Sequence, residues 1–172
     1  LYRRRSDGTL FLDIEPINLD PPASPSAIEE ASDCNRAWFF NTNETYGPGA
    51  YARMLERQVA AIEGYSDGGH VLSRGARPGD LVYAYRNGTG IIARGTVVNG
   101  DVQLAEPKQT VFPEATGDNE WHLRVDWTPF KKPMPNAEVR KVTGTGLPVR
   151  STFARLWNGK VRQFLASHEQ PG

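Results

Sequence analysis

The stretch Ala37-Trp38-Phe39-Phe40-Asn41-Thr42-Asn43 runs from aromatic residues straight into amides and a hydroxyl. Aromatic side chains favour a buried strand, whereas Asn is depleted in strands, so we predict a strand that ends in hydrogen-bonding groups. The polar residues continue until Gly47-Pro48-Gly49 breaks the chain. This arrangement is typical of a pocket floor and can read the edge of a planar base. The alternative is an ordinary polar turn in which Asn43 or Thr45 caps the next helix.

The length and composition of the chain fit one folded domain. With 172 residues, 38% of them hydrophobic and 10% aromatic, the chain can bury a proper core but is too short for two full domains. No apolar run approaches the roughly 18 to 20 residues that span a bilayer, and no signal-peptide pattern is present. We therefore expect a soluble, cytoplasmic protein. Because the first residue is Leu1 rather than Met, we also expect the chain to be part of a longer protein.

The residues that most often form disulfides or bind metals are few. Cys34 is the only cysteine, so no disulfide can form within the chain. His70, His122 and His168 show no recognisable metal-ligand spacing. We expect neither a metal ion nor another cofactor.

The formal net charge of zero hides a division along the chain. From Arg124 to the end there are nine Lys or Arg and three Asp or Glu, a net charge of +6, so the preceding part carries −6. A basic C-terminal third can supply a phosphate-binding face, because neutralising phosphates releases condensed counterions. Solvated helix faces carry similar charge, so the charge pattern alone leaves both interpretations open.

The first 34 residues differ in kind from the rest. Residues 9–14 can form a strand, but the prolines that follow, with interleaved Ser and Ala, indicate an extended linker. These prolines are Pro16, Pro21, Pro22 and Pro25. We predict an N-terminal extension over 1–34 and a folded domain over 35–172.

The folded part carries one helix signal followed by several strand signals. An apolar stripe at helical spacing predicts one helix that begins after Pro48 and Gly49 and is closed by Gly64. The stripe consists of Tyr51, Met54, Leu55, Val59 and Ile62. Residues 80–85 and 91–98 flank Asn87-Gly88-Thr89-Gly90, which is a strong hairpin signal.

The C-terminal half continues this pattern. Residues 121–127 alternate between polar and apolar and predict a strand that leads into the proline-broken residues 131–135. An extended segment over 147–153 precedes a short amphipathic helix around Val161, Phe164 and Leu165. Few helices and several hairpin-connected strands predict an α+β fold, built on a small curved sheet or barrel with a few flanking helices.

This order of elements resembles the PUA-like superfamily, and within it the EVE and YTH-like domains, over most of the span from Ala37 to Ser167. The stretches that carry the resemblance are 38–43, 79–85, 90–97, and 123–127 with the proline-containing loop that follows. Gly146-Leu147-Pro148-Val149-Arg150 is also similar to the Pro-Val stretch that precedes the phosphate-facing residues of YTH-like domains. The chain departs from the YTH pattern at residues 65–70, where it lacks the Trp-Ser pair.

The resemblance implies a reader of modified DNA or RNA. Extruding a base costs about a few kcal/mol, which stacking on rings and hydrogen bonds to the base edge must offset. The predicted base pocket consists of Asn41, Thr42, Asn43, Tyr46, Tyr65, Ser66, Asp67, Phe112 and Trp121. The predicted contacts to the nucleic-acid backbone are Arg150, Ser151, Thr152, Arg155, Lys131 and Lys132. The alternative for each residue is a structural role, such as Ser151 capping a helix.

The sequence contains none of the common hydrolase signatures, neither a Gly-rich phosphate loop with Lys, nor Gly-x-Ser-x-Gly, nor His-Glu-x-x-His. Asp67 with His70, or Asp126 with His122, can pair as a base and its orienting group, but such neighbours are mostly structural or solvated. A nuclease also needs clustered carboxylates for metal ions, and the basic C-terminal third has few. We predict no catalytic residue in this chain.

These observations predict a single EVE or YTH-like domain that recognises a methylated or hydroxymethylated base, in DNA rather than RNA. We expect it to be the specificity module of a modification-dependent restriction or repair protein, with any cutting done by a fused or associated nuclease domain. The alternatives are a module that acts in RNA modification and a module that binds a small molecule or a protein.

Overall fold

The computed structural model of the protein describes residues 2–4, 10–12, 36–45, 47–64, 68–112 and 119–168. The chain divides into two compact units, Leu1–Cys34 and Asn35–Gly172. In the first unit, β1 (Tyr2–Arg4) pairs antiparallel with β2 (Leu10–Leu12). The prolines of the predicted linker lie outside the described residues. No helix of the described part is long and apolar enough to cross a membrane.

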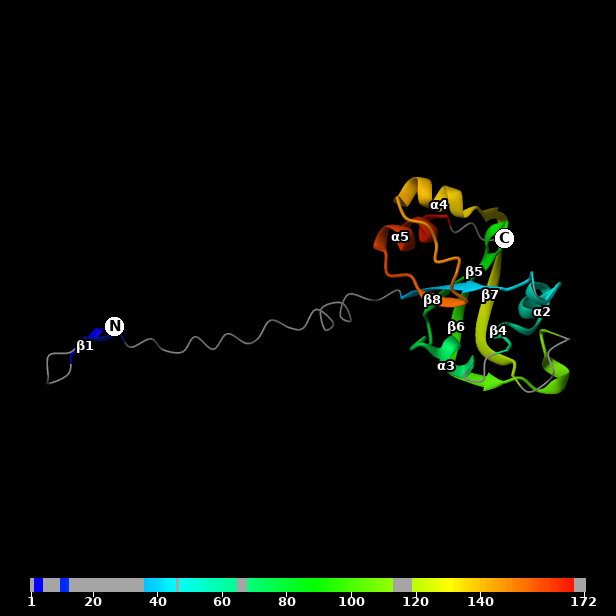
Figure 1. The fold of residues 1–172 in the computed structure, drawn as a ribbon, viewed down its shortest axis with the longest axis horizontal. Coiled ribbons are helices and arrows are strands. Elements are labelled where there is room, and N and C mark those ends of the chain that lie inside the picture. Colours follow the sequence, from blue (N-terminus) through cyan, green and yellow to red (C-terminus); the bar gives the residue numbers. More distant parts are fainter. Residues whose placement is uncertain are drawn as a thin grey trace. The chain divides into compact units, whose positions relative to one another are not determined.

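The second unit is built on a six-stranded sheet in the order β4-β7-β6-β5-β3-β8, which curls into a half-barrel (Figure 1). Its strands are β3 (Ala37–Asn41), β4 (Val59–Ile62), β5 (Leu81–Arg86), β6 (Gly90–Leu104), β7 (Trp121–Met134) and β8 (Phe153–Arg155). The flanking helices are α2 (Ala50–Arg57), α3 (Gly68–Ser73), α4 (Asn136–Thr143) and α5 (Gly159–Ser167), and the 3-10 turn η1 (Pro107–Gln109) follows β6. This architecture confirms the predicted α+β fold on a small curved sheet.

The pair β3–β5 is parallel, whereas the other neighbours in the sheet are antiparallel. Its register runs from Ala37 opposite Leu81 to Asn41 opposite Tyr85. A parallel pair needs a crossover connection, which here consists of α2, β4 and α3. As a result, both strands end at the same end of the sheet.

Every residue of β3 is buried, because the strand has a hydrophobic core on each side. Trp38 and Phe40 belong to one core, which also contains Met54 of α2 and Leu72 of α3. Phe39 belongs to the other core, with Val139 of α4 and Leu165 of α5. Successive side chains of a strand point to opposite faces, so a strand covered on both faces has no polar alternation.

Buried Asp80 fixes the start of the parallel pair. Its carboxylate accepts hydrogen bonds from Arg36 Nη2 at 2.6 Å, from Trp38 Nε1 at 2.8 Å and from the backbone N–H of Arg77 at 2.9 Å. A buried carboxylate needs such partners, because an unpaired one would be strongly disfavoured. Asp80 therefore ties the residues before β5 to the first residues of β3.

The predicted helix that continues to Gly64 is wrong in its second half. Helix α2 ends at Arg57, and Gln58 takes a left-handed conformation with φ of 54°. Val59–Ile62 is instead strand β4, all four residues of which are buried, paired with β7. Val59 and Ile62 fit the helical spacing by coincidence, because a short, fully buried strand is apolar at every position.

The other predicted strands and the C-terminal helix are present with different lengths, whereas the predicted extended segment 147–153 contains a turn at 149–150 and only its last residue belongs to β8. The 80–98 hairpin exists as β5 and β6, although β6 extends to Leu104 past an irregular register after Val97. Strand β7 continues to Met134, and Pro133 falls where the pairing jumps from Ala93–Pro129 to Ile91–Met134. Proline is tolerated there, because such an irregularity leaves residues without ladder hydrogen bonds. The predicted C-terminal helix is α5.

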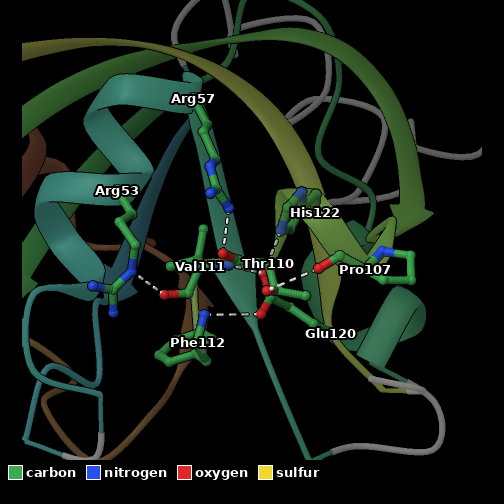
Figure 2. A network of polar contacts seen from close by, with 8 residues as sticks. All are labelled: Arg53, Arg57, Pro107, Thr110, Val111, Phe112, Glu120 and His122. Atoms are coloured by element: carbon green, nitrogen blue, oxygen red, sulfur yellow. Dashed lines mark hydrogen bonds and ion pairs between the residues drawn. The ribbon is translucent and has the colours of Figure 1, made fainter. Parts of the chain in front are cut away.

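A buried carboxylate also holds the loop that follows β6 (Figure 2). Glu120 accepts hydrogen bonds from the backbone N–H of Val111 at 2.5 Å and of Phe112 at 3.0 Å, and it contacts His122 Nε2 at 2.5 Å. From the opposite side, Arg53 and Arg57 of α2 donate to the carbonyl oxygens of Val111 and Thr110. The loop is thus fastened to β7 and to α2, although it has little regular structure of its own.

We expect Glu120→Gln to lower the free energy of unfolding by about 1 to 3 kcal/mol, because the new amide group would face N–H donors where the carboxylate accepts hydrogen bonds. Urea denaturation followed by circular dichroism measures the change. The matched control is Glu106→Gln, since Glu106 is exposed. A Glu120→Gln protein as stable as wild type would show that the carboxylate does not fasten the loop.

Candidate functional site

Several polar segments meet at the end of the sheet where β3 and β5 finish. Asn41 lies opposite Tyr85, and the β5–β6 turn follows directly. On the other side of β3, Phe40 pairs with Phe153, so the residues before β8 reach the same place. We call the residues 41–45, 86–89 and 149–152 the polar end of the sheet.

Asn41 connects all three segments of the polar end. Its backbone N–H donates to the Thr152 carbonyl at 2.8 Å, and its side-chain Nδ2 lies 3.5 Å from both the Val149 carbonyl and Asn87 Oδ1. Its Oδ1 accepts from the backbone N–H of Asn43 at 3.1 Å. The side chain is almost fully buried, so these contacts occupy it.

Thr42 has a structural role, whereas Asn43 is available for a ligand. Thr42 is buried, and its backbone N–H and its Oγ1 both donate to the Tyr85 carbonyl, at 2.9 and 3.2 Å. Asn43 is half-buried and has a φ of 51°, a left-handed conformation that Asn adopts more readily than most residues. Within the described part of the chain, its side-chain amide has no hydrogen-bond partner. An amide in this position can both donate and accept.

A charged pair lies beside this segment. Glu44 Oε2 is 2.8 Å from Arg86 Nε, and Thr45 Oγ1 accepts from Asn87 Nδ2 at 3.4 Å. The charges of this pair affect the phenol of half-buried Tyr51 in α2. Burial is the largest cause of the raised pKa of Tyr51; the negative charge of Glu44 raises this pKa further, and the positive charge of Arg86 lowers it. These contacts join the start of the 41–49 segment to the β5–β6 turn.

Glu44 belongs to the polar stretch expected after β3, whereas Tyr51, Arg86 and Asn87 were not predicted as members of this region. Asn87 was recognised only as a turn residue of the hairpin. Its place beside Asn41 follows from the parallel pairing of β3 with β5, which neither strand signals in its own residues.

The predicted backbone-binding residues lie partly at the same end. Arg150 is exposed, next to Ser151 and Thr152. Ser151 does not cap a helix, because α5 begins at Gly159 with Asn158 as its cap. Lys131 and Lys132 are exposed near the end of β7, beside a cavity of about 350 Å³ that Phe130 and His168 also line. Because Met134 pairs with Ile91 near the start of β6, these lysines reach the same end of the sheet.

The described aromatic residues of the predicted pocket do not lie together at the polar end of the sheet. Tyr46 and Tyr65, with Ser66 and Asp67, lie outside the described residues. Phe112 is buried in the core with α2, and its ring lies so close to Gly47 that a Cβ there would collide with it. This burial corrects the expectation of a pocket ring, since the loop contacts described above carry Phe112 inward.

Trp121 and Arg155 also have partners within the fold. Trp121 is half-buried, and its ring lies against Gly68 and Gly69 at the start of α3. The guanidinium of Arg155 lies over the ring of Trp157, 3.9 Å from its centroid. The contact of Trp121 with α3 joins distant segments, so the sequence does not show it, whereas Arg155 and Trp157 are only two residues apart in the chain.

No protein-family model and no curated protein sequence matches the chain. Solved structures do match it, and the human THYN1 protein in complex with DNA containing 5-methylcytosine is one of them. It has a TM-score of 0.51 at 13% identity, over 80% of this chain and 99% of that chain.

Two further structures have the same arrangement. The YTH domain of the Zygosaccharomyces rouxii MRB1 protein, in complex with N6-methyladenosine RNA, gives a TM-score of 0.52 at 10% identity over 81% of this chain and 90% of that chain. Protein PSPTO5229 from Pseudomonas syringae gives 0.51 at 13% identity, over 77% of this chain and 99% of that chain. The chain therefore shares its fold with these structures, as the resemblance seen in its sequence predicts.

We expect Glu44→Gln to lower the pKa of the Tyr51 phenol, because it removes a negative charge that disfavours the phenolate. Absorbance at alkaline pH, with a Tyr51→Phe protein subtracted, measures the titration. The raised pKa means that folding favours the protonated phenol, so this contribution to stability is present below about pH 10 and is lost as the pH rises through the folded-state pKa. Glu138→Gln, at an exposed position of α4, serves as the control. An unchanged titration in Glu44→Gln would contradict the proximity of the two groups.

Proposed function

We propose that this chain binds nucleic acid and holds one modified base at the polar end of the sheet. The observation that carries the proposal is the attachment of residues 149–152 to Asn41, through the 2.8 Å hydrogen bond to Thr152 and the side-chain contact to Val149. Exposed Arg150 lies between Val149 and Thr152 in the chain, and Asn43 follows Asn41 by two residues, so we infer that the two side chains serve one ligand. A base and the phosphate beside it require such neighbouring groups.

The shared fold of the THYN1 and MRB1 structures supports the proposal, since each of those was solved with a nucleic acid that carries a modified base. We propose DNA as the first target and RNA as the alternative. We also propose that the chain is the specificity module of a larger restriction or repair protein, because its sequence has no common hydrolase signature.

The chemistry assigns different tasks to the polar residues. Asn41 and Thr42 are occupied by the fold and shape the site, whereas the amide of Asn43 would bind the edge of the extruded base. Tyr46, three residues after Asn43, would stack on a face of the base, which offsets the cost of extrusion. Tyr65 follows β4, whose last residue Ile62 pairs with Trp121 at the other end of the sheet, so we retain it as a further candidate and not as a partner of Asn43. We retain Ser66 and Asp67 as further candidates for the base edge.

The basic residues along the sheet end would hold the sugar–phosphate backbone. Strand β7 is three strand positions from β3 in the sheet, which corresponds to about 14 Å. Phosphates follow one another every ~3.4 Å along one strand of a duplex, so a bound strand that reaches Arg150 can also reach Lys131 and Lys132 within about five nucleotides.

Titration of the protein with matched DNA and RNA oligonucleotides tests this function. The set contains unmodified strands and strands with 5-methylcytosine, 5-hydroxymethylcytosine or N6-methyladenine at one position. Tighter binding to one modified strand than to its unmodified partner is the expected result. Equal binding to all members of the set would refute the proposal.

We expect Asn43→Gly to reduce the preference for the modified base by about 1 to 3 kcal/mol, because an amide lost from a base edge costs that much discrimination. Glycine is the suitable replacement, since it tolerates the positive φ of residue 43 where alanine would add strain. Affinity for the unmodified strand and the melting temperature should stay nearly unchanged. Asn119→Gly is the control, because exposed Asn119 precedes β7 at the other end of the sheet. A wild-type ratio in Asn43→Gly would place the pocket elsewhere.

We expect Arg150→Ala to weaken binding to modified and unmodified strands equally, because a phosphate contact carries no base information. The slope of log affinity against log salt should decrease by roughly one unit. Lys108→Ala, which removes an exposed charge from η1, should leave the slope unchanged. Selective loss of the modified strand in Arg150→Ala would instead assign Arg150 to the pocket.

A further inference from the structure

Trp157 is the most exposed large hydrophobic residue of the described chain, with 64% of its surface accessible. It lies in the short connection between edge strand β8 and helix α5. Tryptophan usually buries its large ring, and exposed tryptophans are enriched where proteins bind partners. The ring thus requires an explanation that the core does not supply.

The connection that carries Trp157 is anchored on both sides. Leu156 is buried, and its backbone N–H donates to the Ala37 carbonyl at 2.8 Å. Asn158 caps α5, since its Oδ1 accepts from the backbone N–H groups of Lys160 at 2.9 Å and of Val161 at 3.3 Å. The backbone at Trp157 is therefore held in place, which reduces the entropy lost when a partner binds.

The side chain is oriented as well. The guanidinium of Arg155 lies 3.9 Å from the centroid of the Trp157 ring, within the range of a cation–π contact. The apolar residue before a helix cap often packs against the fourth residue of the helix, but that residue here is Arg162. Most of the ring surface stays open to solvent.

The charge around Trp157 indicates the chemistry of the partner. Residues 139–168 contain no Asp or Glu, and their cations are Arg140, Lys141, Arg150, Arg155, Lys160 and Arg162. These residues come from α4, the loop before β8, β8 and α5, and α4 and α5 lie side by side (Figure 1). Exposed Glu138 lies in the first turn of α4, so the surface is predominantly basic. An aromatic ring within such a surface fits a ligand that has both negative charge and flat rings, which is a strand of nucleic acid.

The distance to the polar end of the sheet fits one bound strand. Thr152 and Trp157 are five residues apart, so at about 3.3 Å per residue they are separated by at most ~17 Å. At ~3.4 Å per nucleotide, this separation corresponds to about five nucleotides of a stacked strand. A strand whose modified base lies at the polar end can therefore pass along β8 to Trp157.

We propose that Trp157, held by Arg155, is a second nucleic-acid contact that stacks on a base up to about five nucleotides from the one held at the polar end of the sheet. This contact rests on the proposed function and extends it: the protein binds an unpaired or frayed segment, not the modified base alone. Arg155, expected from the sequence to grip phosphate, instead orients the stacking ring.

The test compares a single-stranded eleven-mer that has the modified base at its centre with the corresponding three-mer, each with an unmodified partner. Trp157→Ala should weaken both eleven-mers about tenfold or more, because loss of a stacking ring costs about that much per base. The three-mers, measured by competition, should bind Trp157→Ala as they bind wild type, since they cannot span the distance. Trp157→Phe should recover most of the affinity, because it keeps an aromatic face.

Val142→Ala is the matched control, since Val142 is a 60% exposed apolar residue of α4. Melting temperatures verify that each variant folds. Wild-type affinity of Trp157→Ala for the eleven-mers, or an equal loss in Val142→Ala, would overturn the proposal. So would unchanged affinity together with altered self-association in sedimentation, which would assign the ring to a protein partner.

Failure of the proposed function has a separate signature. In that case wild type would bind modified and unmodified eleven-mers equally, while the loss in Trp157→Ala would still be visible on both. The ratio between modified and unmodified strands thus reports on the pocket, and the effect of Trp157→Ala common to both reports on the stacking contact.

Discussion

The parallel pairing of β3 with β5 is the constraint on which the rest of this domain depends. It brings the carboxyl ends of two strands from distant parts of the sequence to one end of the sheet. The carboxylate of Asp80 holds the beginning of the pair, and Thr42, through its bonds to Tyr85, holds its end. Because the strands cannot slide, the polar residues that follow them are fixed in position as well.

The residues of the polar end therefore divide into supports and contacts. Asn41 is buried, and its side-chain amide forms hydrogen bonds with neighbouring segments. A buried polar group needs such partners, because burial without them has a large desolvation cost. Asn43, two residues later, leaves the strand in a left-handed conformation and keeps its amide available. A recognition residue works best when the residues behind it are rigid, and Asn41 supplies that rigidity here.

The distribution of charge along the chain also matters for binding. A chain with zero net charge has little overall attraction for a polyanion, but the segment 139–168, which contains most of α4 together with β8 and α5, has no Asp or Glu. Local potential rather than net charge determines how a charged strand approaches a surface. Two of the acidic residues have a structural role, because the carboxylates of Asp80 and Glu120 accept hydrogen bonds from the backbone of loops.

Much of the fold was predictable from local patterns: the β5–β6 hairpin from its turn residues, the β7 strand from its alternation, and α5 from its apolar spacing. The order of these elements was enough to show the resemblance to EVE and YTH-like domains. The predictions failed where a pattern had two solutions. Val59–Ile62 satisfies helical spacing and is nevertheless a strand, because burial on both faces removes the polar positions that distinguish the two.

The sequence by itself determined that an aromatic strand leads into amides, that the C-terminal third is basic, and that the chain forms an α+β fold. Only the tertiary structure decided which of these residues meet. It placed Asn87 beside Asn41, buried Phe112 in the core and set the ring of Trp121 against Gly68 and Gly69. The physical reason is that burial and hydrogen bonding between distant segments determine which strands pair and how loops pack. Such long-range contacts produce no periodic pattern in the sequence.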